Sequence, residues 1–247
     1  MIVLVDEVVS QDETTITSNA ADSTGVENIR AVQLSTNWRR TVSGILRVTI
    51  EATESVSVDY VAIIVGPSTG TLNVTAQTSA TTGGSYVSAG SATALAKPLT
   101  YLSFASRNAR RIRLSFSGSG NQVLDLQRVM AGMTVTVTQT DIATTIDKVR
   151  TDRQEFSLSG QFYGDPGIVR REQGYSIPAT MPGSEKRALE AVLDKVGRFA
   201  PFVVSRFSAP AQWITEAPIY GVMVEDESYT HHGSDIWSAS IAMREVF

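Results

Sequence analysis

The stretch Ile45-Leu46-Arg47-Val48-Thr49-Ile50-Glu51-Ala52 decides the fold class of this chain. Apolar side chains alternate along it with polar or charged ones, which is the two-residue period of a strand with one buried face and one face in water. A second run, Val58 to Val65, follows closely and is apolar on both faces. Such a run suits a central strand that is covered on both sides. Together the two runs predict a β-sheet protein with an apolar interior.

The same alternation recurs in the rest of residues 1 to about 140, which are rich in Ser, Thr, Val, Ala and Gly. Three further stretches carry it: Leu72–Ala76, Arg111–Phe116 and Met133–Val137. Glycine-rich turn signals separate the strands, at Gly66–Gly70, Gly83–Ser85 and Gly118–Asn121. Many short strands joined by such turns are typical of a β-sandwich or jelly roll. We therefore predict a sandwich domain over residues 1–140.

The composition changes after this domain. Thr138 to Arg153 is polar and charged without a clear period, so we predict a linker there and a domain boundary near residue 141. We expect a strand to begin around Phe156, Leu158 and Phe162. This strand opens the second predicted domain, which runs to the end of the chain.

One convincing helix lies in the second domain and is expected to open at Ser184, with Glu185 in its first turn. Apolar residues at helical spacing give it one buried stripe: Leu189, Val192, Leu193 and Val196. Gly197 stands where a helix commonly stops. Three strands follow, over Phe202–Phe207, Ile219–Val224 and Ile236–Phe247. Residues 141–247 therefore predict a small α+β domain, with one helix packed on an antiparallel sheet.

Composition excludes several kinds of function. The 247 residues contain no cysteine, which removes disulfides, thiolate metal sites and cysteine nucleophiles. The 21 basic and 25 acidic residues give a net charge of −4 without a long run of either sign, so we expect no nucleic-acid partner. No apolar stretch is long enough for membrane insertion, and the first residues lack a signal-peptide pattern. We expect synthesis in the cytoplasm.

Catalytic and metal-binding patterns are weak. The two histidines, His231 and His232, are neighbours in a polar loop, so in extended chain they point in opposite directions and serve one metal ion poorly. A hydrolase triad would have to use one of them, and no Gly-x-Ser-x-Gly motif is present. The carboxylates of Glu225, Asp226 and Glu227 are the remaining candidates, as a glycosidase pair at a hairpin tip. We predict no enzyme, and no catalytic, cofactor or metal residues.

Aromatic side chains offer the better candidates for binding. Trp38 beside Arg39 and Arg40 forms a cluster that can stack on a sugar or on another protein, and Trp38 can equally be a core residue of the first sandwich strand. In the second domain, three aromatic residues are open to the same two interpretations, as core or interface: Trp213, Tyr220 and Tyr229.

The order of strands in residues 25 to 140 resembles a galactose-binding-like, discoidin-type β-sandwich. The residues that carry the resemblance are Trp38, Gly44–Val48, Val58–Ile64, Leu72–Gln77, Arg110–Phe116 and Leu124–Gly132. The last stretch is the most specific, because such sandwiches often end in a similar strand–turn–strand arrangement. The ligand residues of the family lie in variable loops, so none is transferred to this sequence.

The second domain resembles the C-terminal portion of tailed-phage tail-tip proteins. The resemblance rests on Glu185–Val192, on Gly197–Val204 and on the terminal strand Trp237–Val246. It implies a siphophage distal tail, minor tail or baseplate protein in the virion. Such a protein would form a trimeric or hexameric ring and connect the tail tube and tail hub to a tail fibre or to a host surface glycan.

Three hypotheses follow. The first is this structural component of a phage tail tip, in which one domain presents outward and the other supplies sheet edges to neighbouring subunits. The second is a carbohydrate-binding module that uses Trp38 and the sandwich loops. The third, an enzyme, rests on the three acidic residues at 225–227 alone. The fold does not choose among them, because sandwich domains host unrelated functions.

Overall fold

The computed structural model describes residues 1–9, 13–22, 24–30, 37–92, 94–95, 98–138, 141–150, 153–156, 162–165, 169–198, 200–207 and 218–246. The chain divides into two compact units. The sandwich unit comprises Leu4–Thr134, and the C-terminal unit comprises Met1–Val3 together with Val135–Val246. The division therefore falls at residue 134, ahead of the predicted boundary, and the first three residues belong with the C-terminal unit.

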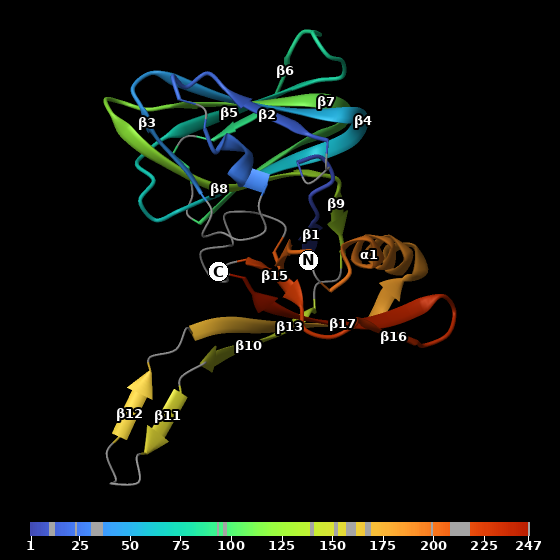
Figure 1. Cartoon of the computed structure of the whole chain (residues 1–247). Helices are drawn as coiled ribbons and strands as arrows, with labels where there is room; N and C mark the ends of the chain where they lie inside the picture. The colour runs from blue at the N-terminus through green and yellow to red at the C-terminus, as the bar shows by residue number, and fades with distance from the viewer. Residues whose placement is uncertain are drawn as a thin grey trace. The chain divides into compact units, whose positions relative to one another are not determined.

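The sandwich unit is built on one seven-stranded antiparallel sheet (Figure 1). Its strands follow the order β3-β8-β4-β7-β5-β6, and β2 pairs with β4. Their bounds are β2 Thr15–Ser18, β3 Trp38–Val42, β4 Ile45–Val65, β5 Asn73–Ser79, β6 Val87–Ala92, β7 Leu99–Ser117 and β8 Gln122–Gly132. A short 3-10 helix, Val26–Arg30, packs on this sheet through Val26 and Ile29.

Two long strands fold the sheet around its core. Strand β4 has 21 residues and β7 has 19, and their pairing shifts register between Glu51 and Val56 and again between Val58 and Tyr60. The first half of β4 pairs with β2, whereas the second half pairs with β8. Such bulges bend a sheet, and here both halves of β4 contribute buried residues to a single apolar core. The two runs that predicted the fold are the two halves of this one strand.

The C-terminal unit has an eight-stranded sheet with the order β10-β13-β17-β15-β14-β1-β9, and β16 pairs with β17. The bounds are β1 Ile2–Leu4, β9 Thr134–Thr136, β10 Ala143–Arg150, β13 Val169–Pro182, β14 Phe202–Ser205, β15 Ile219–Met223, β16 Ser228–His231 and β17 Ile236–Glu245. Strands β11 (Arg153–Phe156) and β12 (Phe162–Asp165) form a separate two-stranded ribbon between β10 and β13 in the chain. No helix among the described residues is long and apolar enough to cross a membrane.

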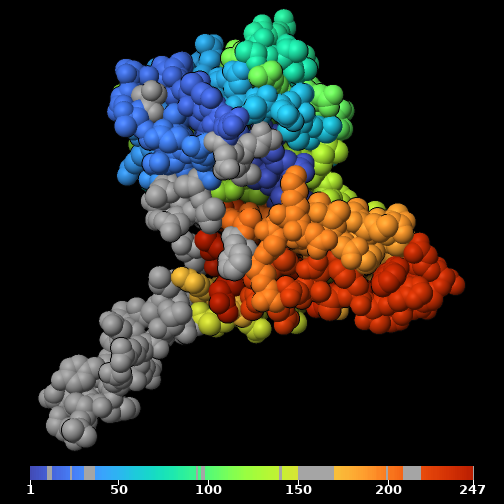
Figure 2. Space-filling model, turned by 45° about the vertical axis from the view of Figure 1, so that its right-hand side comes forward, coloured from blue at the N-terminus to red at the C-terminus, as the bar shows by residue number. Residues whose placement is uncertain are grey.

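The helix α1 (Gly183–Val196) buries Leu189, Leu193 and Val196, three of the four residues of the predicted stripe. It lies beside β13 and β17, as the orange and red surfaces of Figure 2 show. The predicted start at Ser184 is wrong by one residue. Pro182 is the N-cap and makes no side-chain capping bond, and Gly183 instead donates its backbone N–H to the carbonyl of Asp235 at 3.0 Å. A tertiary contact therefore replaces the local cap.

The predicted fold class is confirmed in its general form, mainly β with one helix on an antiparallel sheet in the C-terminal unit. The resemblance of the sandwich to galactose-binding-like domains stays a prediction. The predicted linker, Thr138 to Arg153, is wrong for most of its length, because β10 occupies Ala143–Arg150 and pairs with β13 over eight residues. The side chains of residues 143–149 are exposed or partly exposed on both faces of this edge strand, so burial imposes no apolar alternation on its sequence. The strand expected around Phe156 and Phe162 is a hairpin, and Leu158 lies outside the described residues.

Candidate ligand-binding face

The outward side of the sandwich sheet bears a mostly polar surface, here called the outer face, which Ile45 borders at one end. It is formed by Thr15, Thr17, Arg47, Thr49, Glu51, Thr75, Gln77, Arg111, Arg113 and Ser115, which strand register places in rows across β2, β4, β7 and β5. In one row Thr49 faces Arg113, which faces Gln77; in the next, Glu51 faces Arg111. The residues between them on β7, such as Ile112 and Leu114, are fully buried. Alternation thus sends every second side chain to water.

Tyr86, just before β6, lies over two arginines of this face. The Cζ atom of Arg113 is 3.8 Å from the centre of the tyrosine ring, and that of Arg111 is 5.3 Å away. Arg113 also donates from Nε and Nη2 to the side-chain carbonyl of Gln77, at 3.0 and 2.6 Å. The guanidinium is therefore held between a ring and an amide, in an attractive cation–π arrangement.

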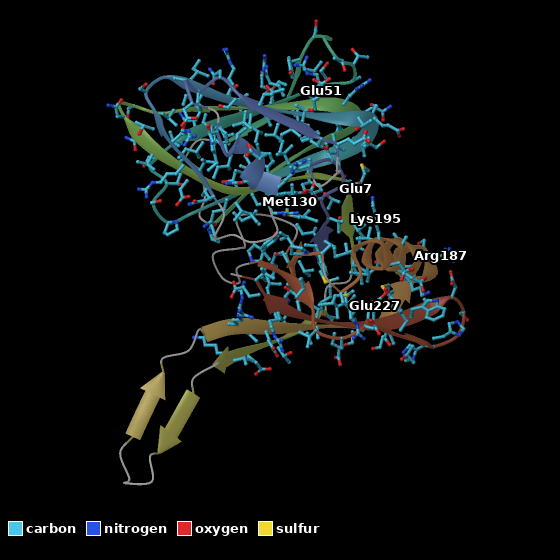
Figure 3. The ribbon with its side chains drawn as sticks, viewed as in Figure 1. Glu7, Glu51, Met130, Arg187, Lys195 and Glu227 are labelled. Carbon is cyan, nitrogen blue, oxygen red and sulfur yellow. The ribbon has the colours of Figure 1, made fainter. Side chains whose placement is uncertain are left out.

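Glu51 completes the cluster from β4, and Figure 3 labels it on the sandwich. Its Oε2 lies 3.3 Å from Nε of Arg111, and its Oε1 accepts a hydrogen bond of 2.7 Å from the hydroxyl of Thr82. The side chains of Arg111 and Glu51 are 24% and 29% exposed. They are fixed by neighbours and are still reachable from solvent. We call Glu51, Gln77, Tyr86, Arg111 and Arg113 the Tyr86 cluster.

The Tyr86 cluster has the chemistry of a small polar-ligand site. One aromatic ring offers an apolar surface, while guanidinium and amide groups offer several N–H donors and the carboxylate offers acceptors. Groups already held in place lose little conformational entropy when they bind a ligand. This combination is suited to a ring-shaped ligand that carries hydroxyl groups.

Trp38 does not lie on a surface. It is 1% exposed and belongs to the sandwich core. Of the two interpretations that the sequence allowed, core residue or surface contact, the structure supports the first. Arg40 is partly exposed and donates to the backbone carbonyls of Asp22 and Thr24, at 2.9 and 2.7 Å. Arg39 is exposed. A glycan or protein contact by Trp38 is inconsistent with this burial, whereas one by Arg39 and Arg40 stays a prediction.

The aromatic residues of the C-terminal unit divide in the same way. Tyr220 is buried, and Trp213 lies outside the described residues. Tyr229 is half-buried, and burial of its hydroxyl group raises its pKa. Together with Trp237 it flanks the ammonium of Lys186, which lies 4.9 and 5.1 Å from the two ring centres. These rings therefore fasten the first turn of α1 to the β16–β17 hairpin.

The residues considered for catalysis do not converge on one site. The carboxylate of Asp226 forms a bidentate pair with Arg198, and that hydrogen bond lowers the pKa of Asp226, which suits structure better than proton donation. The imidazole of His232 shares a 2.9 Å hydrogen bond with Ser238, while the ring of His231 packs on Trp237. Within the described part of the chain, no three His, Cys, Asp or Glu side chains are grouped to hold a metal ion. The absence of enzymatic activity stays a prediction.

The Tyr86 cluster was not predicted from the sequence. The alternation in Arg111–Phe116 does place Arg111 and Arg113 on the outward face, so the two arginines of the cluster were predictable from the sequence. Tyr86 stands in a glycine-rich turn, and its contact with Arg113 depends on how the β5–β6 hairpin pairs. Pattern alone does not reveal a contact across strands that are separated in the chain.

No protein-family model matches this chain, and no curated protein is significantly similar to it. Several solved structures overlap half of it. CpGH89CBM32-6 from Clostridium perfringens is 14% identical, with 51% of this chain and 98% of the module covered and a TM-score of 0.42. The CBM32 of AlyQ, solved with 4,5-unsaturated mannuronic acid, is 24% identical, with 51% and 95% covered and a TM-score of 0.42.

A third structure, the GH29 fucosidase of Ruminococcus gnavus, is 12% identical and has a TM-score of 0.45. The overlap covers 51% of this chain but only 26% of the fucosidase. At such identities and TM-scores, the similarities say nothing about a ligand of this chain.

Proposed function

We propose that the sandwich unit is a non-catalytic carbohydrate-binding module. The observation that carries this proposal is the Tyr86 cluster, in which an aromatic ring lies on the outer face among fixed and partly exposed polar side chains. Sugar rings bind proteins through apolar contact with an aromatic ring and through hydrogen bonds to planar polar groups. The cluster supplies both on one sheet.

Replacing Tyr86 with alanine should weaken glycan binding by about tenfold, the effect of losing ~1.4 kcal/mol. The ring provides the apolar contact, and its removal also frees the Arg113 guanidinium from its stacked position. A glycan array identifies the bound sugars, and titration calorimetry on the full chain measures the change in Kd.

The control is Val87→Ala, because Val87 is the exposed neighbour of Tyr86 and makes none of these contacts. It should bind as the wild type does. A wild-type chain that binds no glycan on the array contradicts the proposal. Equal binding by the Tyr86→Ala variant would place the carbohydrate site elsewhere and remove the cluster as its basis.

A second proposal concerns the C-terminal unit: that it assembles copies of the chain into a trimeric or hexameric ring in a phage tail tip. The observation that favours assembly is strand β10, the edge of the eight-stranded sheet. An open edge presents backbone groups that can pair with another strand. Ile146 on this strand is 50% exposed and Val149 is also exposed, so apolar contact would accompany the pairing.

Replacing Ile146 with lysine should shift the chain from an oligomer to a monomer in solution, because a charged side chain on an edge strand opposes pairing. Light scattering coupled to size-exclusion chromatography measures the mass. The matched control is Ile45→Lys, since Ile45 is 57% exposed but lies on the sandwich. A wild-type chain that is monomeric at every concentration, and does not bind tail proteins, would contradict the assembly role.

A further inference from the structure

Charge on the outer face has the opposite sign to that of the whole chain. The full sequence carries a net charge of −4, whereas the outer face bears Arg47, Arg111 and Arg113 against the carboxylate of Glu51 and that of Glu13 at its border, which accepts a hydrogen bond from Thr53. All other members of the face are uncharged and polar. A surface of this kind attracts anions and offers hydroxyl and amide groups around them.

Among the residues that the structure describes, two of these arginines have no acidic partner. Arg111 lies beside Glu51, whereas the side-chain hydrogen bonds of Arg113 to this part of the chain go to the neutral side chain of Gln77. Arg47 forms no ion pair with any described residue. The charge on both therefore remains available to a ligand. The guanidinium of Arg113 is also already held in one orientation, which favours bidentate binding of a carboxylate or phosphate.

The three arginines occupy consecutive rows of the face. Arg111 and Arg113 are two residues apart on β7, and Arg47 faces Ser115, the next outward residue on that strand. Outward residues on one strand are about 6.6 Å apart, at ~3.3 Å per residue. Each row therefore adds one guanidinium along the strand direction, and Tyr86 lies over the arginines of the first two rows. This spacing suits a ligand with repeated negative charges.

We propose that the outer face binds an acidic oligosaccharide, with its carboxylate or phosphate groups on Arg113, Arg111 and Arg47 and one sugar ring on Tyr86. This inference rests on the proposed carbohydrate-binding function and names its ligand class. A nucleic acid is the poorer fit, because single strands are bound by several stacked aromatic rings, whereas Tyr86 is the ring that this part of the sheet supplies.

The test uses the full chain and four probes in titration calorimetry: oligogalacturonate, a glycerol-phosphate oligomer, a neutral galactan oligomer and oligothymidylate. We expect binding of at least one acidic probe, at least about tenfold tighter than that of the neutral one, and a Kd that rises with salt concentration. Which acidic probe binds identifies carboxylate or phosphate as the recognised group. Arg113→Gln should weaken this binding about tenfold, and the double variant with Arg47→Gln should weaken it further.

Arg187→Gln is the matched control, because Arg187 is exposed on α1 in the C-terminal unit, and it should leave the Kd unchanged. Arg113→Lys keeps the positive charge but loses the paired N–H donors of the guanidinium, so it should bind with intermediate affinity. Circular dichroism checks that the variants fold alike. Tighter binding of the neutral oligomer would overturn the acidic ligand and leave carbohydrate binding standing. No binding of any glycan would overturn both. Equal affinity for oligothymidylate would reduce the face to a general polyanion surface.

Discussion

Replacing Arg128 with methionine should lower the free energy of unfolding of the sandwich unit by about 3–5 kcal/mol at pH 7, the usual cost of removing one partner from a buried ion pair. Arg128 on β8 lies 3.4 Å from Asp6, and their side chains are 3% and 2% exposed. Asp6 also accepts the backbone N–H of Val9 at 2.9 Å, and Arg128 donates to the carbonyl of Arg30 at 2.8 Å. The variant would leave the carboxylate buried without this cation.

The loss should depend on pH. Burial raises the pKa of Asp6 to about 6, although Arg128 and three backbone N–H groups act to lower it. Because the pKa of Asp6 is higher in the folded chain than in the unfolded chain, its protonated form favours the folded state. This contribution to stability is complete below the unfolded pKa of 3.8 and is lost as pH rises through the folded pKa of about 6. It amounts to roughly 3 kcal/mol, at 1.36 kcal/mol per unit of pKa. At pH 4 Asp6 is neutral, so the Arg128→Met variant should lose less stability there than at pH 7.

Urea unfolding at both pH values, followed by tryptophan fluorescence, measures this difference. The control is Arg198→Met, which breaks a solvent-exposed pair with Asp226 and should change the free energy of unfolding far less than Arg128→Met does. An Arg128→Met variant as stable as the wild type at pH 7 would show that the pair contributes no net stability. An equal loss at pH 4 and pH 7 would instead attribute the effect to lost packing.

Replacing Trp38 with alanine should lower the free energy of unfolding of the sandwich by about 3–5 kcal/mol, the usual cost of truncating a buried aromatic residue. Trp38 stands opposite Leu126 in the β3–β8 pair and belongs to the apolar core of the unit. Its indole Nε1 has no hydrogen-bond partner among the described residues, so the ring contributes through packing. Denaturant unfolding followed by circular dichroism measures the loss.

Trp38→Phe is the informative companion, because it keeps an aromatic ring in the core and should therefore cost clearly less than Trp38→Ala. Folded Trp38→Phe protein should bind any glycan with the affinity of the wild type. A selective loss of glycan binding in this variant would restore Trp38 as a contact residue, against its burial. Arg39→Ala, at an exposed position, should change stability by no more than about 0.5 kcal/mol.

The fold was predictable to the extent that it depends on local periodicity. The alternation in Ile45–Ala52 identified a strand and also which side chains it buries, and the helical spacing of Leu189, Leu193 and Val196 identified α1 and its buried stripe. Strand β10 was not predictable in this way. Its residues lie at a sheet edge, where burial imposes no regular pattern, and its pairing with β13 bridges the intervening ribbon.

Sequence alone thus determined the fold class and which side chains of a strand face the core or the solvent. The outward arginines of β7 are an example. Tertiary structure alone decided the contacts between distant segments. It placed Tyr86 over Arg113, buried Asp6 against Arg128 at a separation of 122 residues, and joined β1 to the sheet of the C-terminal unit. The physical reason is that side-chain period is a property of one strand, whereas partner and register depend on how all the strands close around a common core.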